Sequence, residues 1–165
     1  MSVSGITETV QYLTFKLADE IFAFDVAKVR EILEITTITK VPQTPDFMRG
    51  VINLRGSVVP VIDLKQSFGM ARTEQTVNTC IIVVEVYLDG ETIILGVLAD
   101  SVQEVVEMEP DLIESPPRLG TKLNTEFIKG MGKVENNFVM ILDIDKVFSA
   151  QELTDLQTTS AAVTE

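Results

Sequence analysis

The sequence contains two copies of one pattern, and this internal repeat restricts the possible folds more than any other feature. Residues 44–64 align without a gap on residues 124–144, at an offset of 80. Four positions are identical in the two copies: Phe47/Phe127, Gly50/Gly130, Val59/Val139 and Asp63/Asp143. Residues 21–35 align on residues 94–108 at an offset of 73, so the second copy has a longer connection, rich in proline. Each half of the chain is therefore expected to form the same structural unit.

Each copy is predicted to be β structure. Residues 12–16 and 81–87 are rich in β-branched and aromatic residues, and a turn and a second apolar run follow each, which predicts two hairpins. Residues 58–64 and 138–144 are short apolar runs that predict buried strands. Pro60 lacks a ladder donor and indicates a sheet edge or a barrel corner.

Two segments have helical character. Valines and leucines between Asp25 and Glu34 fit both helical and strand spacing, and we expect one helical turn followed by a strand. In residues 145–156, Val147, Phe148, Leu153 and Leu156 recur at helical spacing, which predicts a terminal helix.

Repeat units of about 70 to 80 residues are too short to form an extended sandwich each, whereas small closed barrels leave no exposed strand edges. We therefore expect a mainly all-β fold: two tandem five-stranded barrels related by a pseudo-twofold axis, with a groove between them and short helices. The expected boundaries are an N-terminal tail over residues 1–10, one domain over residues 11–156 and a disordered tail over residues 157–165. The domain would contain intertwined subdomains over residues 11–75 and 76–145, followed by the C-terminal helix.

The residue inventory excludes most catalytic chemistries. The chain has no histidine and a single cysteine, Cys80, so histidine-based acid–base catalysis, Ser-His-Asp or Cys-His nucleophiles and Cys/His zinc sites are excluded. A net charge of −12 argues against binding to nucleic acid or to an anionic membrane. No apolar run approaches the roughly 18 residues of a membrane span, and the first ten residues lack a secretory signal pattern. We expect a cytoplasmic protein without membrane insertion.

Carboxylates, lysines, arginines and hydroxyls remain available, so a small carboxylate- or metal-dependent hydrolase stays an alternative. Asp63 and Asp143 form a symmetric pair, but each ends an apolar strand and is expected to accept hydrogen bonds from turn amides. The nine acidic residues from Glu85 to Glu114 lack the ligand alternation of a calcium loop. No metal or cofactor is expected.

Arg55 is the residue that the repeat does not explain. Glu135 stands at its position in the second copy, so the barrel itself does not require an arginine there. An arginine between a strand and a glycine turn presents a donor fork that suits a partner carboxylate. A surface arginine without a role is the alternative.

Several segments in the two halves match a known pattern. In the first half these are Val29-Arg30-Glu31-Ile32, Thr44-Pro45, residues 47–56 with Asn53-Leu54-Arg55-Gly56, and residues 59–64; in the second half, residues 96–102, 127–130 and 141–143. They resemble the CheW family, the coupling proteins of bacterial chemotaxis, over residues 11–156. The resemblance implies two SH3-like barrels and a non-catalytic adaptor. Such an adaptor would join the cytoplasmic tips of chemoreceptors to the regulatory domain of the histidine kinase CheA, in membrane-associated receptor arrays.

The resemblance also implies a receptor-binding groove formed by six residues: Val26, Val29, Glu31, Gly50, Arg55 and Val105. A receptor tip is a helical hairpin, which requires apolar walls for its anchors and charges that fix its register. The valines would form the walls, Gly50 would permit close backbone approach, and Arg55 with Glu31 would form an exchangeable charge pair. Because Glu104, the repeat mate of Glu31, lacks a matching arginine, receptor binding is expected on one face only. The protein alone is expected to be monomeric, and no residue is implied for the kinase interface.

Overall fold

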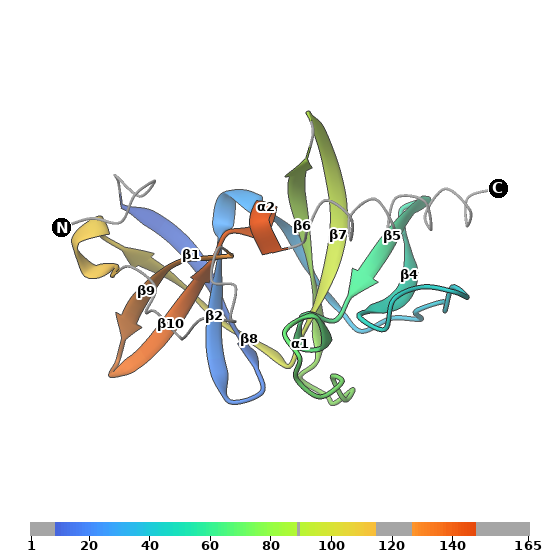
Figure 1. Cartoon of the computed structure of the whole chain (residues 1–165), viewed down its shortest axis with the longest axis horizontal. Helices are drawn as coiled ribbons and strands as arrows, with labels where there is room; N and C mark the ends of the chain where they lie inside the picture. The colour runs from blue at the N-terminus through green and yellow to red at the C-terminus, as the bar shows by residue number, and fades with distance from the viewer. Residues whose placement is uncertain (1–8, 89, 115–126, 148–165) are drawn as a thin grey trace.

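The computed structural model describes residues 9–88, 90–114 and 127–147, which form two five-stranded sheets side by side (Figure 1). The first sheet has the order β8-β1-β2-β10-β9, with β1 Val10–Leu17, β2 Glu20–Asp25, β8 Ser101–Met108, β9 Ile128–Val134 and β10 Asn137–Leu142. The second has the order β3-β6-β7-β5-β4, with β3 Val29–Glu34, β4 Met48–Leu54, β5 Ser57–Ile62, β6 Cys80–Leu88 and β7 Glu91–Ala99. The helices are short: η1 Val26–Lys28, α1 Leu64–Ser67, η2 Pro110–Leu112 and α2 Ile144–Val147.

The two sheets are equivalent strand by strand, which confirms the expected pair of related five-stranded units. In terms of the repeat, β8, β1, β2, β10 and β9 correspond to β3, β6, β7, β5 and β4, and the two sheets have these strands in the same order. One pair of neighbouring strands is parallel in each sheet: β2 with β10, where Val139 lies opposite Ile21, and β7 with β5, where Val61 lies opposite Gly96.

Each barrel combines strands from both halves of the chain. The hairpin β1–β2 from the first copy joins β8, β9 and β10 of the second, and the hairpin β6–β7 joins β3, β4 and β5. The expected division into residues 11–75 and 76–145 therefore follows the repeat and does not follow the sheets. The correction has a physical reason: a repeat shows which segments are equivalent, but not from which copy a strand takes its partner.

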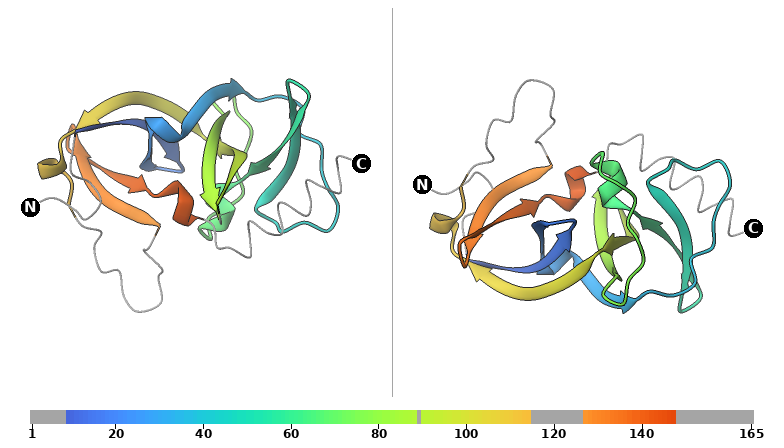
Figure 2. Two further views of the ribbon diagram at one scale, coloured as in Figure 1. Left: turned by 90° about the horizontal axis from the view of Figure 1, so that it is seen from above. Right: turned by 90° about the horizontal axis from the view of Figure 1, so that it is seen from below.

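An isolated bridge closes each sheet on itself. β3 and β4 are the two outer strands of their sheet, and Thr39, in the connection between them, bridges to Val51 on β4. Glu114 bridges to Met131 at the equivalent place in the other sheet. Both sheets therefore curl into barrels, as the two views along the sheets show (Figure 2).

The barrels are held together by a shared apolar core. One buried cluster lies inside each barrel, and a third, larger cluster collects side chains from both sheets, among them Phe15, Phe22 and Phe24 of the first sheet and Ile82 and Val97 of the second. Along the hairpin strands, successive buried side chains point alternately into the cluster of their own barrel and into the cluster shared by both barrels. Because both faces of these strands are buried, the hairpins read as continuous apolar runs in the sequence.

Polar contacts also join the barrels. The Asp100 carboxylate accepts hydrogen bonds from the backbone N–H of Ala18 at 2.6 Å and from Lys65 Nζ at 3.1 Å. Asp145, on α2, accepts hydrogen bonds from Lys28 Nζ at 3.0 Å and from the backbone N–H of Tyr87 at 2.8 Å. Asp100 therefore links the β1–β2 turn of the first sheet to α1, which follows β5 of the second, and Asp145 on α2 links η1 to β6.

The local predictions are confirmed in part. Both hairpins form, and Asp25 accepts a hydrogen bond from Ala27 N and caps η1, which leads into β3 as expected. Of the two expectations for Pro60, the sheet edge is wrong, because β5 lies between β7 and β4, and the barrel corner stays a prediction. The residues of β5 that pair with β7 begin at Val61, beyond the proline.

The expected terminal segments lie largely outside the described residues. The predicted C-terminal helix begins as α2, and residues 148–156 and 157–165 are not among the described residues. Of the expected N-terminal tail, Val10 already belongs to β1, and residues 1–8 are not described. In the described part of the chain, no helix has the length and apolarity needed to cross a membrane.

Candidate functional site

Arg55 and Gly56 form the two-residue turn between β4 and β5. Their φ angles of 51° and 86° are both positive, as a type I′ hairpin turn requires. Asn53 stabilises the turn by accepting a hydrogen bond from the Gly56 N–H at 2.8 Å. In the second copy, Glu135 and Asn136 have φ angles of 50° and 69°. The turn backbone therefore belongs to the fold, whereas the arginine side chain is particular to the first copy.

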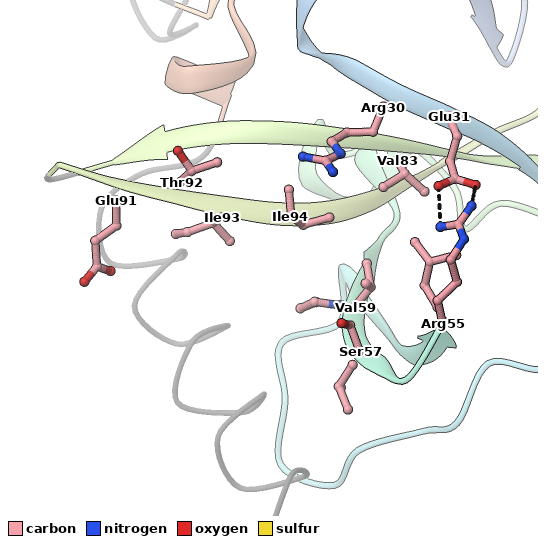
Figure 3. A pocket seen from close by; sticks show the side chains of 13 residues that line it. Arg30, Glu31, Arg55, Ser57, Val59, Val83, Glu91, Thr92, Ile93 and Ile94 are labelled. Atoms are coloured by element: carbon pink, nitrogen blue, oxygen red, sulfur yellow. Dashed lines mark hydrogen bonds and ion pairs between the residues drawn. The ribbon is translucent and has the colours of Figure 1, made fainter.

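The Arg55 guanidinium forms a bidentate ion pair with Glu31. Nη1 donates to Oε2 and Nη2 donates to Oε1, each at 2.8 Å (Figure 3). The Arg55 side chain is 71% exposed and that of Glu31 is 27% exposed. The hydrogen bond from Arg55 lowers the pKa of Glu31 and the pairing raises the pKa of Arg55. Both groups are therefore fully charged at neutral pH, and the expected pair of Arg55 and Glu31 is present.

The ion pair borders a hollow of the surface, which has a volume of about 800 Å³. Its floor is apolar and comes from three strands, with Leu54 beside the turn, Val59 on β5, and Ile93 and Ile94 on β7 (Figure 3). Arg30 also lines it and pairs with Glu85. Figure 3 shows Arg30, Glu31 and Arg55 gathered at one side of this apolar floor. We call it the Arg55 hollow.

The equivalent place in the other barrel has two carboxylates and no cation in its lining. A smaller hollow of about 240 Å³ is lined by Glu104 and Glu135, the repeat mates of Glu31 and Arg55. Neither glutamate has an ion-pair partner among the described residues. The two barrels therefore offer different surfaces: an arginine–glutamate pair in one and two carboxylates in the other.

The remaining expected groove residues do not line the Arg55 hollow. Val26 and Val29 are partly buried against the core shared by the barrels, and Gly50 is buried. Val105 is 52% exposed on β8, in the other sheet. Of the six residues, only Glu31 and Arg55 line the Arg55 hollow, where they form the ion pair.

A second hollow lies between β3 and the segment that leads into β6. It has a volume of about 570 Å³, and it is lined mainly by residues 32–35 and 75–80, with Val102 of β8. Ile32 is 46% exposed. Sequence reasoning missed Ile32, which lies between the less exposed Glu31 and Leu33, as the alternation of a strand requires.

The absence of a side chain at Gly50 serves the packing of the chain itself. Its φ angle is 142°, and a Cβ atom there would lie 2.2 Å from the carbonyl oxygen of Thr39. The neighbouring residue Val51 forms both hydrogen bonds of the barrel-closing bridge with Thr39, each at 2.9 Å. The close backbone approach that Gly50 permits is thus made within the barrel.

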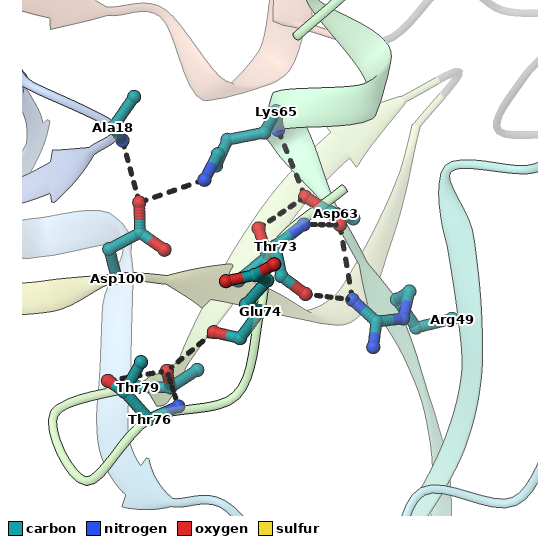
Figure 4. Close-up of polar contacts among 9 residues, drawn as sticks. All are labelled: Ala18, Arg49, Asp63, Lys65, Thr73, Glu74, Thr76, Thr79 and Asp100. Atoms are coloured by element: carbon teal, nitrogen blue, oxygen red, sulfur yellow. Dashed lines mark hydrogen bonds and ion pairs between the residues drawn. The ribbon is translucent and has the colours of Figure 1, made fainter. Parts of the chain in front are cut away.

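Asp63 is a structural carboxylate. It is completely buried and accepts hydrogen bonds from Thr73 N at 2.9 Å, Thr73 Oγ1 at 2.7 Å, Lys65 N at 3.2 Å and Arg49 Nη1 at 3.2 Å (Figure 4). Its repeat mate Asp143 accepts one from Asp145 N at 3.2 Å. Both aspartates bond turn amides, as expected, and nothing here supports the hydrolase alternative.

In the part of the chain that the structure describes, the other acidic residues and Cys80 form no metal site. Within residues 9–88, 90–114 and 127–147, no three carboxylate or thiol groups lie close enough together to hold a metal ion. Cys80 is half-buried at the start of β6, and burial raises the pKa of its thiol, which keeps it protonated.

The family model described as the CheW-like domain matches residues 11–152. The chain belongs to the CheW-like family. Chemotaxis protein CheW of Klebsiella aerogenes is 32% identical over 151 residues, which cover 92% of this chain and 89% of that protein. Chemotaxis protein CheW of Thermotoga maritima is 31% identical and covers 83% of this chain and 86% of its own length.

A solved structure has the same fold. The scaffolding protein TtCheW of Thermoanaerobacter tengcongensis is 34% identical, superposes with a TM-score of 0.75, and covers 87% of this chain and 94% of its own. The CheW-like chain described here thus has the SH3-like tandem barrels that the resemblance implied.

Proposed function

We propose that this CheW-like chain is a non-catalytic adaptor that joins chemoreceptor tips to the histidine kinase CheA in cytoplasmic receptor arrays. Its relatives are named chemotaxis proteins, and its structural neighbour is described as a scaffolding protein. The observation in this chain that carries the proposal is the Glu31–Arg55 pair beside an apolar hollow, because the equivalent place in the other barrel has no cation.

The Arg55 hollow suits a protein partner. Its apolar floor would accept apolar side chains, and the exposed guanidinium can exchange Glu31 for a partner carboxylate at little cost, because surface ion pairs contribute little to stability. Binding at such a site is weak for one copy. An adaptor in an array gains its stability from many such contacts at once.

The exposed valine of β8 belongs to a second part of the proposed surface. Val105 on β8 and Ile32 on β3 are exposed apolar residues, and Ile32 lines the second hollow, to which β8 contributes Val102. A helical hairpin presents apolar anchors on one face, which exposed apolar residues of this kind would accept. Val26 and Val29 are only partly buried against the shared core, so each would add some apolar area to the proposed surface.

Co-purification tests the proposal directly. The chain would be immobilised and offered a cytoplasmic receptor fragment and the regulatory domain of CheA, separately and together. We expect retention of both and greatest retention when both are present. Retention of neither would refute the adaptor function.

Isothermal calorimetry with Mg²⁺ and Ca²⁺ tests the hydrolase alternative. Tight binding of either ion at a fixed stoichiometry would favour a metal site instead.

A further inference from the structure

Three cations gather around two adjoining hollows on the second barrel. Lys40, Arg49 and Arg72 line both a hollow of about 220 Å³ and one of about 560 Å³. Lys40 lies in the connection between β3 and β4, Arg49 on β4, and Arg72 in the segment after α1. Three separate segments therefore bring positive charge to one place in a chain whose net charge is −12.

These charges are only partly neutralised. Lys40 and Arg72 form no ion pair with any residue that the structure describes, and both are exposed. Arg49 uses Nη1 for Asp63 and for the carbonyl oxygen of Thr73, while its other terminal nitrogen points away from both in Figure 4. Asp46 lines the smaller hollow, and no acidic residue lines the larger one.

Gln66 contributes an amide group to the smaller hollow. It lines this hollow, and its Oε1 atom is buried without a hydrogen-bond donor among the described residues. Buried amide groups are normally hydrogen-bonded. An oxyanion accepts hydrogen bonds, so the NH₂ group of Gln66 would be the donor to it.

We propose that Lys40, Arg49, Arg72 and Gln66 form an oxyanion-binding site for a carboxylate or phosphate group. Guanidinium groups bind such oxyanions through paired N–H donors, and the ammonium group of Lys40 adds a third charge. The smaller hollow is large enough for one such group and too small for a helix. The site lies apart from the Arg55 hollow, with which it shares no lining residue, and does not depend on receptor or kinase binding.

The test is an NMR titration of the full isotope-labelled chain with two probes, sodium phosphate and a triglutamate peptide, at constant ionic strength. We expect saturable shifts at the backbone amides around Lys40 and Arg72 with at least one probe. A Lys40→Ala/Arg72→Ala double variant should bind that probe at least about tenfold more weakly. Both residues are exposed, so the variant should fold normally; Lys133→Ala, an exposed lysine on β9 of the other sheet, is the matched control and should bind normally.

The outcomes separate the sources of the oxyanion. Preference for phosphate would identify a free phosphate or phosphoryl ligand, and preference for triglutamate would identify the carboxylates of an acidic segment. The proposal is overturned if neither probe gives saturable shifts, or if the double variant and the Lys133→Ala control bind equally well.

Discussion

Glu31 and Arg55 meet across the closing seam of one barrel, because β3 and β4, the strands that place them, are the two outer strands of the sheet. The pair is exposed on its arginine side and lies beside the Arg55 hollow. Water and salt screen such a contact, so it contributes little to the stability of the barrel. Its position favours a role in binding.

Replacement of Arg55 by glutamate is expected to abolish receptor-dependent control of CheA. The substitution removes the donor fork and places a second carboxylate opposite Glu31, so that the hollow resembles that of the other barrel. Receptor binding should weaken by at least about tenfold, while the thermal midpoint should move by no more than about 2 °C. A reconstituted receptor–kinase assay and a melting curve measure the two effects, and normal coupling by the variant would contradict the proposed role.

Exchange of the two charges tests whether the ion pair alone is needed. In the double variant Glu31→Arg/Arg55→Glu the two side chains can pair again, but the cation moves from the turn to β3. If a partner carboxylate binds at the position of Arg55, the exchanged protein should stay uncoupled in the same assay. Full recovery of coupling would show that the pair acts only within the chain.

The pKa of the Glu31 carboxyl is expected to report its ion pair with Arg55. The pKa of Glu31 is lowered in the folded chain, so the pairing stabilises the fold at pH values above the unfolded-state pKa and is lost as the pH falls through the folded-state pKa. The NMR midpoint of the Glu31 carboxyl should therefore lie below the ordinary glutamate value. It should rise in Arg55→Gln and stay unchanged in Lys133→Gln; an unchanged midpoint in Arg55→Gln would refute the assignment.

Gly50→Ala should destabilise the barrel by about 3 kcal/mol, because the new Cβ atom meets the Thr39 backbone and the φ angle disfavours a side chain. Gly69→Ala is a matched control: its φ angle of 80° is also positive, but a Cβ atom there would have no neighbour within 4 Å. The control should cost only about 1 kcal/mol. Urea unfolding of both variants measures the difference, and equal losses would show that the contact with Thr39 is unimportant.

Asp63→Ala should cost about 3 kcal/mol, since it leaves the Arg49 guanidinium and two Thr73 donors without their buried acceptor. Asp143→Ala, at the equivalent position of the other copy, removes one capping hydrogen bond and should cost about 1 kcal/mol or less. Chemical denaturation compares the two. Similar losses would mean that the network around Asp63 adds nothing to the cap.

The sequence predicted the features that depend on local pattern or on the repeat. Hairpins, the helical turn after Asp25, the five-stranded units and the unmatched Arg55 were all visible in it. Apolar runs, turn residues and capping side chains act over a few neighbouring residues, so they can be recognised in the sequence without knowledge of the tertiary structure. The family resemblance added Glu31 as the partner of Arg55.

The sequence could not show which strands the intertwined halves exchange. The repeat shows that β1–β2 and β6–β7 are equivalent, but either hairpin satisfies the same pattern in either barrel. The sheet-edge alternative for Pro60 was wrong for the same reason, because a strand is internal or outer only after its neighbours are known. The surroundings of Gly50 likewise depend on Thr39, eleven residues earlier, which only barrel closure brings near.

By itself, the sequence determined a duplicated β fold without histidine chemistry, in which the second copy has no cation at the position of Arg55. Only the tertiary structure decided which hairpin completes which barrel, that Glu31 and Arg55 border an apolar hollow, and that Lys40, Arg49 and Arg72 gather at one place. The physical reason is that local patterns specify each strand and turn, whereas closure and packing of the whole chain select the partners. Surfaces formed by segments far apart in the chain therefore appear only once the barrels are assembled.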